Sequence, residues 1–468
     1  MSDIFRKMPL EVILSEKKDG PRLKRVYGTL ELIMMGVGVV IGTGLFVVTG
    51  VAAADYAGPA LVLSFILAGI ACACAALCYA ELASMIPASG SSYTFCYVGL
   101  GEIWGWFVAW CLILEYIVAL SAISTGWSAY AASFLSVIGA DLPSALLSGP
   151  FSGGVINLPA VLIISVITLL TLMGAKESAW VNNILVVVKL GVVALFIILG
   201  LKHVNAANFV PFMPYGWDGV FAGAAIVFFA YLGFDAIPNA AEEVKDPARD
   251  LPRGIIGALI IVTILYVVVT LILTGMLPYY SYHEIASPVA YALAQVGIQW
   301  GSALVSIGAI TGLTSGVLVM IYASSRLFYA ISRDGLLPTR FSKIREKAGT
   351  PATAITLVWL LSCLIAGFLP IGVIVELVNM GTLSAFILVS ITVIRLRKSH
   401  PDLERVFRVP FVPVIPIISV LICGFFAFQL AAVTKVAFLG WCALGLIIYF
   451  GYGMRHSLLG KRLGGDSH

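Results

Sequence analysis

The sequence predicts an all-α integral membrane protein with twelve transmembrane helices, and three observations lead to this prediction. Of the 468 residues, 60% are hydrophobic and only 11% are charged, whereas soluble domains carry about 25% charged residues. Apolar runs of about 20 residues, the length that crosses about 30 Å of hydrocarbon, recur along the whole chain. Two of these runs are interrupted by glycine, which is typical of transporter helices that surround a binding site.

The twelve runs follow one another closely and leave too few residues for a separate soluble domain. They cover residues 29–50, 59–86, 103–132, 155–173, 178–200, 217–241, 254–276, 300–331, 352–369, 372–394, 414–433 and 436–453. The segment 1–27 precedes them and the tail 454–468 follows them.

The distribution of Lys and Arg predicts the orientation. Of the 28 basic residues, 25 fall in the termini and in loops on one side of the membrane. The other side holds Lys202 and Lys435, and Lys189 lies within a run. Because basic loops stay in the cytoplasm, we expect a multi-pass protein of the plasma (inner) membrane with both termini cytoplasmic. The net charge of +4 therefore comes from the basic residues that keep these loops on the cytoplasmic side. We expect contact with membrane lipid and none with nucleic acid, which needs a concentrated basic surface.

The runs divide into two blocks of five and a final pair. Residues 28–200 hold the first five helices and residues 216–394 the next five, and each block opens with a glycine-broken run. Because five is odd, the second block enters the membrane with the opposite orientation, so the two repeats are expected to be inverted. Residues 414–453 supply helices 11 and 12.

The first break lies within 36–44 (GVGVVIGTG) and the second within 228–235 (FFAYLGFD). Glycine destabilises a helix by about 1 kcal/mol per residue. A membrane protein tolerates the freed backbone groups only where they are buried in protein or line a cavity. Close helix packing through small residues is the alternative interpretation of either motif alone. The pair at corresponding positions favours a binding site.

Broken helices can bind a zwitterion with backbone groups alone. A half-helix that begins in the membrane offers free N–H groups and partial positive charge, and one that ends there offers free C=O groups. An amino acid carries both matching charges. The residues expected around it are Val40, Ile41, Gly42, Thr43 and Gly44 at the first break, and Phe229, Ala230 and Leu232 at the second.

Three charged residues lie deep in the runs and are functional candidates by default, because charge inside the membrane is costly. Lys189 has no local partner and could gain and lose a proton during transport, the alternative being that it extends to the headgroups. Asp235 follows the second break and either contacts substrate or caps a helix. Glu115 either contacts substrate or braces its helix.

Several motifs resemble the amino acid–polyamine–organocation superfamily of transporters, most closely the bacterial relatives of the cationic amino acid transporters. They are 228–235, 241–252 (AEEVKDPARDLP), 42–46 (GTGLF), 79–82 (YAEL) with Ser89 and Gly90, and 332–338 (SRDGLLP). The resemblance implies a LeuT-like fold of two inverted five-helix repeats plus two peripheral helices.

The resemblance also implies roles for individual residues. It implies that the substrate carboxylate binds near Thr43 and Gly44. The carbonyls that would receive the ammonium group are those of Val40, Phe229, Ala230 and Leu232. In proton-coupled relatives, a lysine matching Lys189 replaces a sodium ion between helices 1 and 8. The chain departs from some relatives at Cys111, where they carry an acidic residue.

Together these features predict a transporter that imports an L-amino acid with a proton, without a cofactor. Lys189 is the expected coupling group. Glu115 and Asp235 would favour a cationic substrate such as arginine, lysine or ornithine, and a small neutral amino acid such as alanine is the other expectation. An amino-acid exchanger and a non-transporting membrane sensor are the alternatives. No protease-type or Ser/His arrangement lies within the runs, so an enzyme is not expected.

Overall fold

The computed structural model describes residues 5–8, 27–86, 90–137, 139–173, 176–285, 287–345 and 350–465. Across these residues the regular elements are all helices. Two isolated β-bridges pair Tyr27 with Val244 and Arg345 with Thr350. The predicted all-α class is therefore confirmed.

The helices fall into three groups by length. The long ones are α4 (Leu61–Met85), α6 (Glu102–Val137), α8 (Lys176–Leu201), α10 (Pro247–Met276), α12 (Gln299–Arg333) and α14 (Ile371–Ser399). The medium apolar ones are α7 (Leu158–Met173), α13 (Ala352–Phe368), α15 (Val414–Gln429) and α16 (Ala432–Ile448). The short ones are α5 (Ser92–Gly99), α11 (Pro288–Gln295), α17 (Met454–His456) and α18 (Leu458–Gly465).

Two further segments are helical but broken. The first comprises α2 (Thr29–Val40), η2 (Gly44–Val48), α3 (Thr49–Ala52) and η3 (Ala53–Ala57). The second comprises α9 (Gly216–Val227), η8 (Phe228–Tyr231) and η9 (Phe234–Glu243). The breaks fall within the two glycine-containing motifs, as the sequence predicts.

Each predicted apolar run coincides with a helix or a broken helix, within a few residues. In the described chain, eight helical stretches are long and apolar enough to cross a membrane, and the first of them, Thr29–Met85, contains two predicted runs. Helices α7, α13 and α15 are apolar but shorter. The protein is therefore a multi-pass membrane protein, while the count of twelve spans and the inverted repeat stay predictions.

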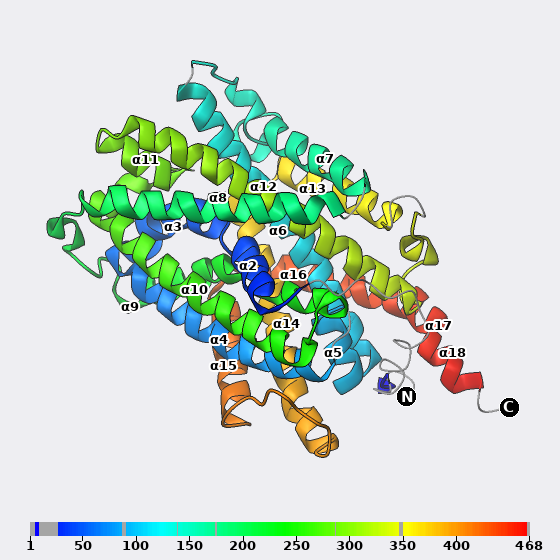
Figure 1. Cartoon of the computed structure of the whole chain (residues 1–468). Helices are drawn as coiled ribbons and strands as arrows, with labels where there is room; N and C mark the ends of the chain where they lie inside the picture. Colours follow the sequence, from blue (N-terminus) through cyan, green and yellow to red (C-terminus); the bar gives the residue numbers. More distant parts are fainter. Residues whose placement is uncertain are drawn as a thin grey trace.

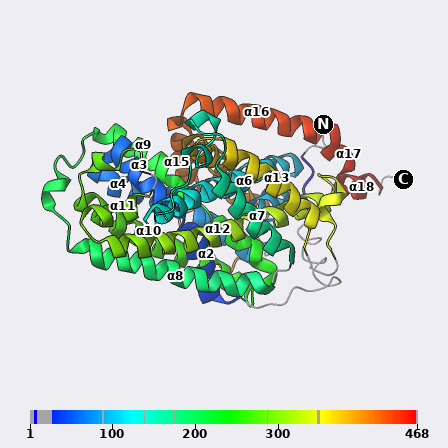
Figure 2. The same ribbon diagram turned by 90° about the horizontal axis from the view of Figure 1, so that it is seen from above.

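Helices α6 and α12 form the middle of the molecule and pack extensively against each other. Helix α14 lies against α6, α8 lies against α12, and α10 packs on both α4 and α2. Figure 2 shows α16 along one edge of the molecule and α8 along the opposite edge. The first broken segment is thus enclosed by α8, α10 and α12, which lie far from it in the sequence.

Aromatic residues pack α16 against α6. The rings of Trp110 and Trp441 stack with their centroids 4.4 Å apart. Each indole N–H donates to the other residue's carbonyl oxygen, at 2.7 and 3.0 Å. Trp106 is buried and donates to Gly445 O at 2.9 Å. Stacked indoles with satisfied N–H groups contribute packing that lipid contact alone does not supply.

The described ends of the chain lie together at one end of the molecule (Figure 1). Arg6 donates to the Glu102 carboxylate from Nε and Nη2, at 2.8 and 2.6 Å. Ser457, between α17 and α18, donates to the same carboxylate at 2.5 Å. Both described ends therefore lie close to Glu102 at one end of the molecule.

Candidate functional site

The first break is a two-residue interruption followed by a new helical start. Helix α2 stops before Ile41, whose backbone is extended at φ −74° and ψ 96°. Helical hydrogen bonding resumes at Leu45 and Phe46, whose amides both donate to Gly42 O at 3.1 Å. The amides of residues 42–44 therefore stand ahead of the first turn, where helix N–H groups have no helical acceptor.

The second break ends with a glycine that no other residue readily replaces. After α9 the chain tightens into the 3₁₀ turn η8 and becomes extended at Leu232, with φ −64° and ψ 145°. Gly233 follows with φ +114°, a left-handed conformation that is favourable only for glycine. Its amide donates to Asp235 Oδ1 at 3.1 Å. Asp235 therefore stabilises the turn at Gly233, while its role as a substrate contact or a helix cap stays a prediction.

The two breaks touch each other. A Cβ on Gly44 would lie 2.3 Å from Ala230 Cα, and a Cβ on Gly233 would lie 2.3 Å from Val39 Cγ1. Real Cβ atoms are not found this close to other heavy atoms, so Gly44 is required by the backbone of Ala230 and Gly233 by the side chain of Val39. The structure therefore brings the predicted residues of the two motifs into one place.

Tyr266 on α10 joins the two breaks. Its hydroxyl oxygen lies 2.7 Å from Val40 O and 2.5 Å from Ala230 O, so its single hydrogen can be donated to either carbonyl. In an unbroken helix each carbonyl would accept from the amide four residues on. The sequence analysis missed Tyr266, because a tyrosine in an apolar run carries no local signal.

Lys189 is buried between the first broken helix and α12. Its side chain is fully shielded from solvent, and Nζ donates to Gly38 O at 2.5 Å. A Cβ on Gly312 of α12 would lie 2.8 Å from Lys189 Cε, so this glycine makes room for the lysine. The lysine points into the bundle, and the alternative that it extends to the headgroups is wrong.

Glu115 and Asp235 form a second group. Asp235 Oδ2 accepts from Tyr116 of α6 at 3.2 Å, and Glu115 is close enough to interact electrostatically with Asp235. Eleven residues further along α6, Gly126 packs against Thr43. At 1.5 Å per residue, Glu115 therefore lies about 16 Å along the helix from the position that faces Thr43.

Among the buried polar atoms without a hydrogen-bond partner in the described chain, three belong to the first broken helix, α6 and α14. They are Thr43 Oγ1, Glu115 Oε2 and Asn379 Oδ1. Asn379 lies on α14 and donates through Nδ2 to Ala225 O, in the last turn of α9, at 2.9 Å. Buried polar groups are normally hydrogen-bonded, and an exception calls for an explanation such as a ligand. Asn379 is a second residue that sequence reasoning missed.

The predicted residues around the breaks are closed off from solvent. Phe229 and Leu232 are the most exposed of the apolar ones, at 6% each, whereas Thr43 is 1% exposed. A substrate held among them would be sealed from both sides.

The known proteins to which the chain is similar are described as permeases or transporters. The sequence profile described as amino acid permease matches residues 27–452. The chain is 50% identical to the methylthioribose transporter of Bacillus subtilis, over 98% of this chain and 100% of that protein. It is 47% identical to the branched-chain amino acid permease BcaP of the same bacterium, over 98% and 99% of the two chains. The vacuolar cationic amino acid transporter 4 of Arabidopsis thaliana shares 37% identity, over 86% of this chain and 68% of that protein.

Proposed function

The chain belongs to the amino acid permease family, and we propose that it imports a neutral L-amino acid together with a proton by alternating access. The observation that carries the proposal is the contact between the two broken helices at Gly44 and Ala230. This contact brings the start of one half-helix beside the backbone of Ala230 in the other break. The proposed location is the plasma (inner) membrane, with both termini in the cytoplasm.

The backbone groups suit the two charges of an amino acid. The amides of Thr43 and Gly44 begin the second half of the first broken helix, where the partial positive charge favours a carboxylate. On the other side, the carbonyls of Val40 and Ala230 already accept from Tyr266. A carbonyl oxygen has two lone pairs, so each also has capacity for an ammonium group. The backbone carbonyls of Phe229 and Leu232 are the other groups proposed to receive the ammonium group.

The charges near the breaks favour a neutral substrate over a cationic one. Both oxygens of Asp235 accept from protein donors, Gly233 N and Tyr116 OH. Glu115 lies about 16 Å along α6 from the position facing Thr43. Two relatives, in Bacillus subtilis and Lactococcus lactis, are named branched-chain amino acid permeases. We therefore propose branched-chain or alanine-like substrates ahead of arginine, lysine and ornithine.

Lys189 is the proposed coupling group. In an unbroken helix Gly38 O would accept from the amide of Gly42, whereas here it accepts from the ammonium group of Lys189. Charged donors form hydrogen bonds about twice as strong as neutral ones. Loss of the proton would weaken this contact and free the first broken helix to move. Proton transfer and helix movement would then be linked through one hydrogen bond, with the proton as the coupling ion and no cofactor.

Uptake into proteoliposomes tests the proposal. Labelled leucine, alanine and arginine are offered to vesicles with and without an inward proton gradient, and with empty or amino-acid-loaded lumens. We expect leucine or alanine to accumulate in empty vesicles, to a level that rises with the gradient. Uptake only into loaded vesicles would instead establish an exchanger, and binding without flux a sensor.

The methylthioribose transporter relative supports a second candidate. Its 50% identity extends over nearly the whole chain, and a thiosugar is a neutral solute without a carboxylate or an ammonium group. Labelled methylthioribose therefore belongs in the same uptake series. Saturable uptake of this sugar, unaffected by excess leucine or alanine, would contradict the amino-acid assignment.

A further inference from the structure

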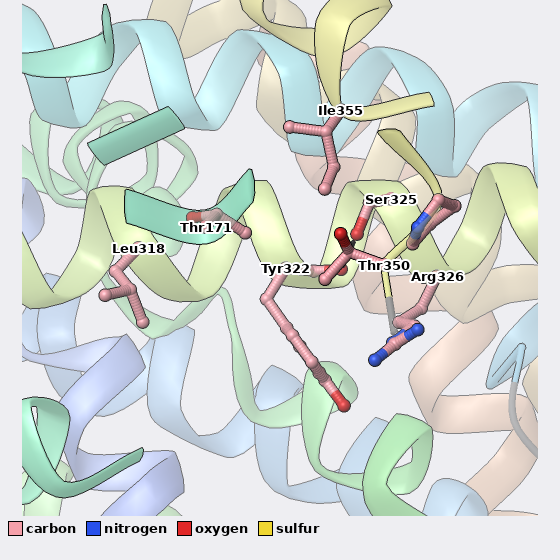
Figure 3. A pocket seen from close by; sticks show the side chains of 8 residues that line it. Thr171, Leu318, Tyr322, Ser325, Arg326, Thr350 and Ile355 are labelled. Carbon is pink, nitrogen blue, oxygen red and sulfur yellow. Dashed lines mark hydrogen bonds between the residues drawn. The ribbon is translucent and has the colours of Figure 1, made fainter. Parts of the chain in front are cut away.

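A small pocket lies where α7, α12 and the start of α13 meet (Figure 3). Its lining residues are Thr171, Leu318, Tyr322, Ser325, Arg326, Thr350, Pro351 and Ile355. Arg326 comes 14 residues after Gly312, which packs on Lys189, and this corresponds to about 21 Å along α12. The pocket is therefore separate from the broken helices.

Arg326 gives the pocket a positive charge, and no carboxylate among the described residues pairs with it. Its guanidinium lies over the Tyr322 ring, 4.9 Å from the centroid. Within the described chain it forms no ion pair. Figure 3 shows the two side chains extending from the same side of α12, with Thr350 beside them. Stacking uses the face of the guanidinium and leaves its N–H edge for an acceptor.

The other wall is the beginning of α13, a helix of 17 residues. Its first helical amide bond runs from Ile355 N to Pro351 O, so the amides of residues 352–354 have no helical acceptor and the helix end carries partial positive charge. Thr350, just before this helix, is 3% exposed, and its Oγ1 has no hydrogen-bond partner among the described residues. A buried, unpartnered hydroxyl in a pocket with two positive features indicates a missing ligand atom.

The size of the pocket limits which chemical group can reach the hydroxyl of Thr350. The pocket offers about 10 Å³ to the centre of a water-sized group, about the space that one such group needs. One oxygen of a larger anion can enter and accept from Thr350, while the rest stays at the mouth beside Arg326. Phosphate suits this arrangement, because arginine binds phosphate oxygens in a bidentate manner.

We propose that this pocket binds one phosphate group, carried either by an anionic lipid or by free phosphate. The surroundings fit a lipid: on α7, close to Thr171, the apolar side chains Leu169, Leu170 and Met173 are exposed by 50–77%. Acyl chains would cover these residues while the headgroup reaches Arg326. Basic residues at the cytoplasmic membrane surface attract anionic lipids in this way.

Ligand-dependent thermal stability of the full-length protein tests the site. The midpoint of unfolding is followed in detergent during titration with phosphatidylglycerol, phosphatidylcholine or inorganic phosphate. We expect stabilisation by phosphatidylglycerol but not by phosphatidylcholine, and about a tenfold weaker apparent affinity in Arg326→Gln, since hydrogen bonds to charged groups are strong. Thr350→Val should weaken binding less. Equal stabilisation by inorganic phosphate would identify free phosphate as the ligand.

Arg340→Gln is the matched control, since Arg340 is an exposed basic residue of the following loop outside the pocket. It should keep wild-type affinity. Substrate uptake by Arg326→Gln in phosphatidylcholine vesicles should equal that of the wild type, which shows that the variant is folded. The proposal is overturned if neither probe stabilises the wild type, or if both arginine variants respond like the wild type.

Discussion

The two broken helices are held open in different ways. At the first break, the freed carbonyls of Gly38 and Val40 accept from Lys189 and Tyr266, which belong to α8 and α10. At the second, Gly233 turns the chain with a positive φ and donates to Asp235, two residues on. The freed carbonyls of the first break thus accept only from side chains of other helices, whereas the second break combines its own Gly233–Asp235 contact with donors from α10 and α6.

This difference indicates which break can respond to a signal. A turn fixed by its own glycine and by an aspartate two residues on depends less on the neighbouring helices. A break that depends on a lysine from another helix changes when the lysine moves or loses its charge. We therefore expect proton coupling to act at the first break, with the second serving as a fixed corner that presents Phe229 and Ala230.

The largest effect is expected from Gly44→Ala. The new Cβ would lie 2.3 Å from Ala230 Cα, and because the obstacle is backbone the two breaks must separate, at a cost of about 1–3 kcal/mol or more. Transport should be lost. Gly42→Ala is the matched control within the same break, because its nearest atom, Val39 O, is 3.7 Å away. Equal uptake by the two variants would contradict direct contact between the breaks.

Lys189→Met should separate coupling from exchange. Methionine keeps an unbranched side chain beside Gly312 but removes the donor to Gly38 O and the titratable group. Gradient-driven uptake into empty vesicles should fall at least about tenfold, which corresponds to 1.4 kcal/mol, while exchange in loaded vesicles persists. Unchanged gradient dependence in this variant would remove Lys189 from the coupling step.

Tyr266→Phe and Asp235→Asn compare the two breaks directly. The first change removes the hydroxyl that serves Val40 O and Ala230 O, and a lost buried partner costs about 1–3 kcal/mol. The second keeps an oxygen for the amide of Gly233. We expect a several-fold lower substrate affinity for Tyr266→Phe and a smaller change for Asp235→Asn, measured by substrate-dependent thermal stabilisation. The reverse order would mean that the second break depends on charge.

The smallest effect concerns the far end of the first broken segment. His283, which lies before α11, contacts Asp55 of η3 through Nδ1 at 2.7 Å. This hydrogen bond and the nearby carboxylates raise the pKa of His283 above 6.5. The ion pair is therefore present at low pH and is lost as the pH rises through the raised pKa. Because the pair is exposed, we expect only a slight change in the pH profile of uptake for His283→Gln. A large shift would assign this contact a gating role.

The sequence predicts the breaks better than it predicts their surroundings. Dense glycine within 36–44 and the lone charge of Lys189 are local signals, and the structure places both at one site. Tyr266 and Asn379 carry no such signal, because their roles arise from packing between helices far apart in the chain. The separation of Glu115 from Thr43 likewise depends on how α6 lies against the first broken helix.

Hydrogen–deuterium exchange at the two breaks tests the central claim most directly. Peptides covering residues 36–46 and 228–238 are compared at pH 6 and pH 9, with correction for intrinsic exchange rates, in wild type and Lys189→Met. We predict faster exchange at the higher pH in the first peptide of the wild type alone, and no pH effect in the second peptide. A pH effect that persists at the first break in Lys189→Met, or that is equal at both breaks, would contradict the account.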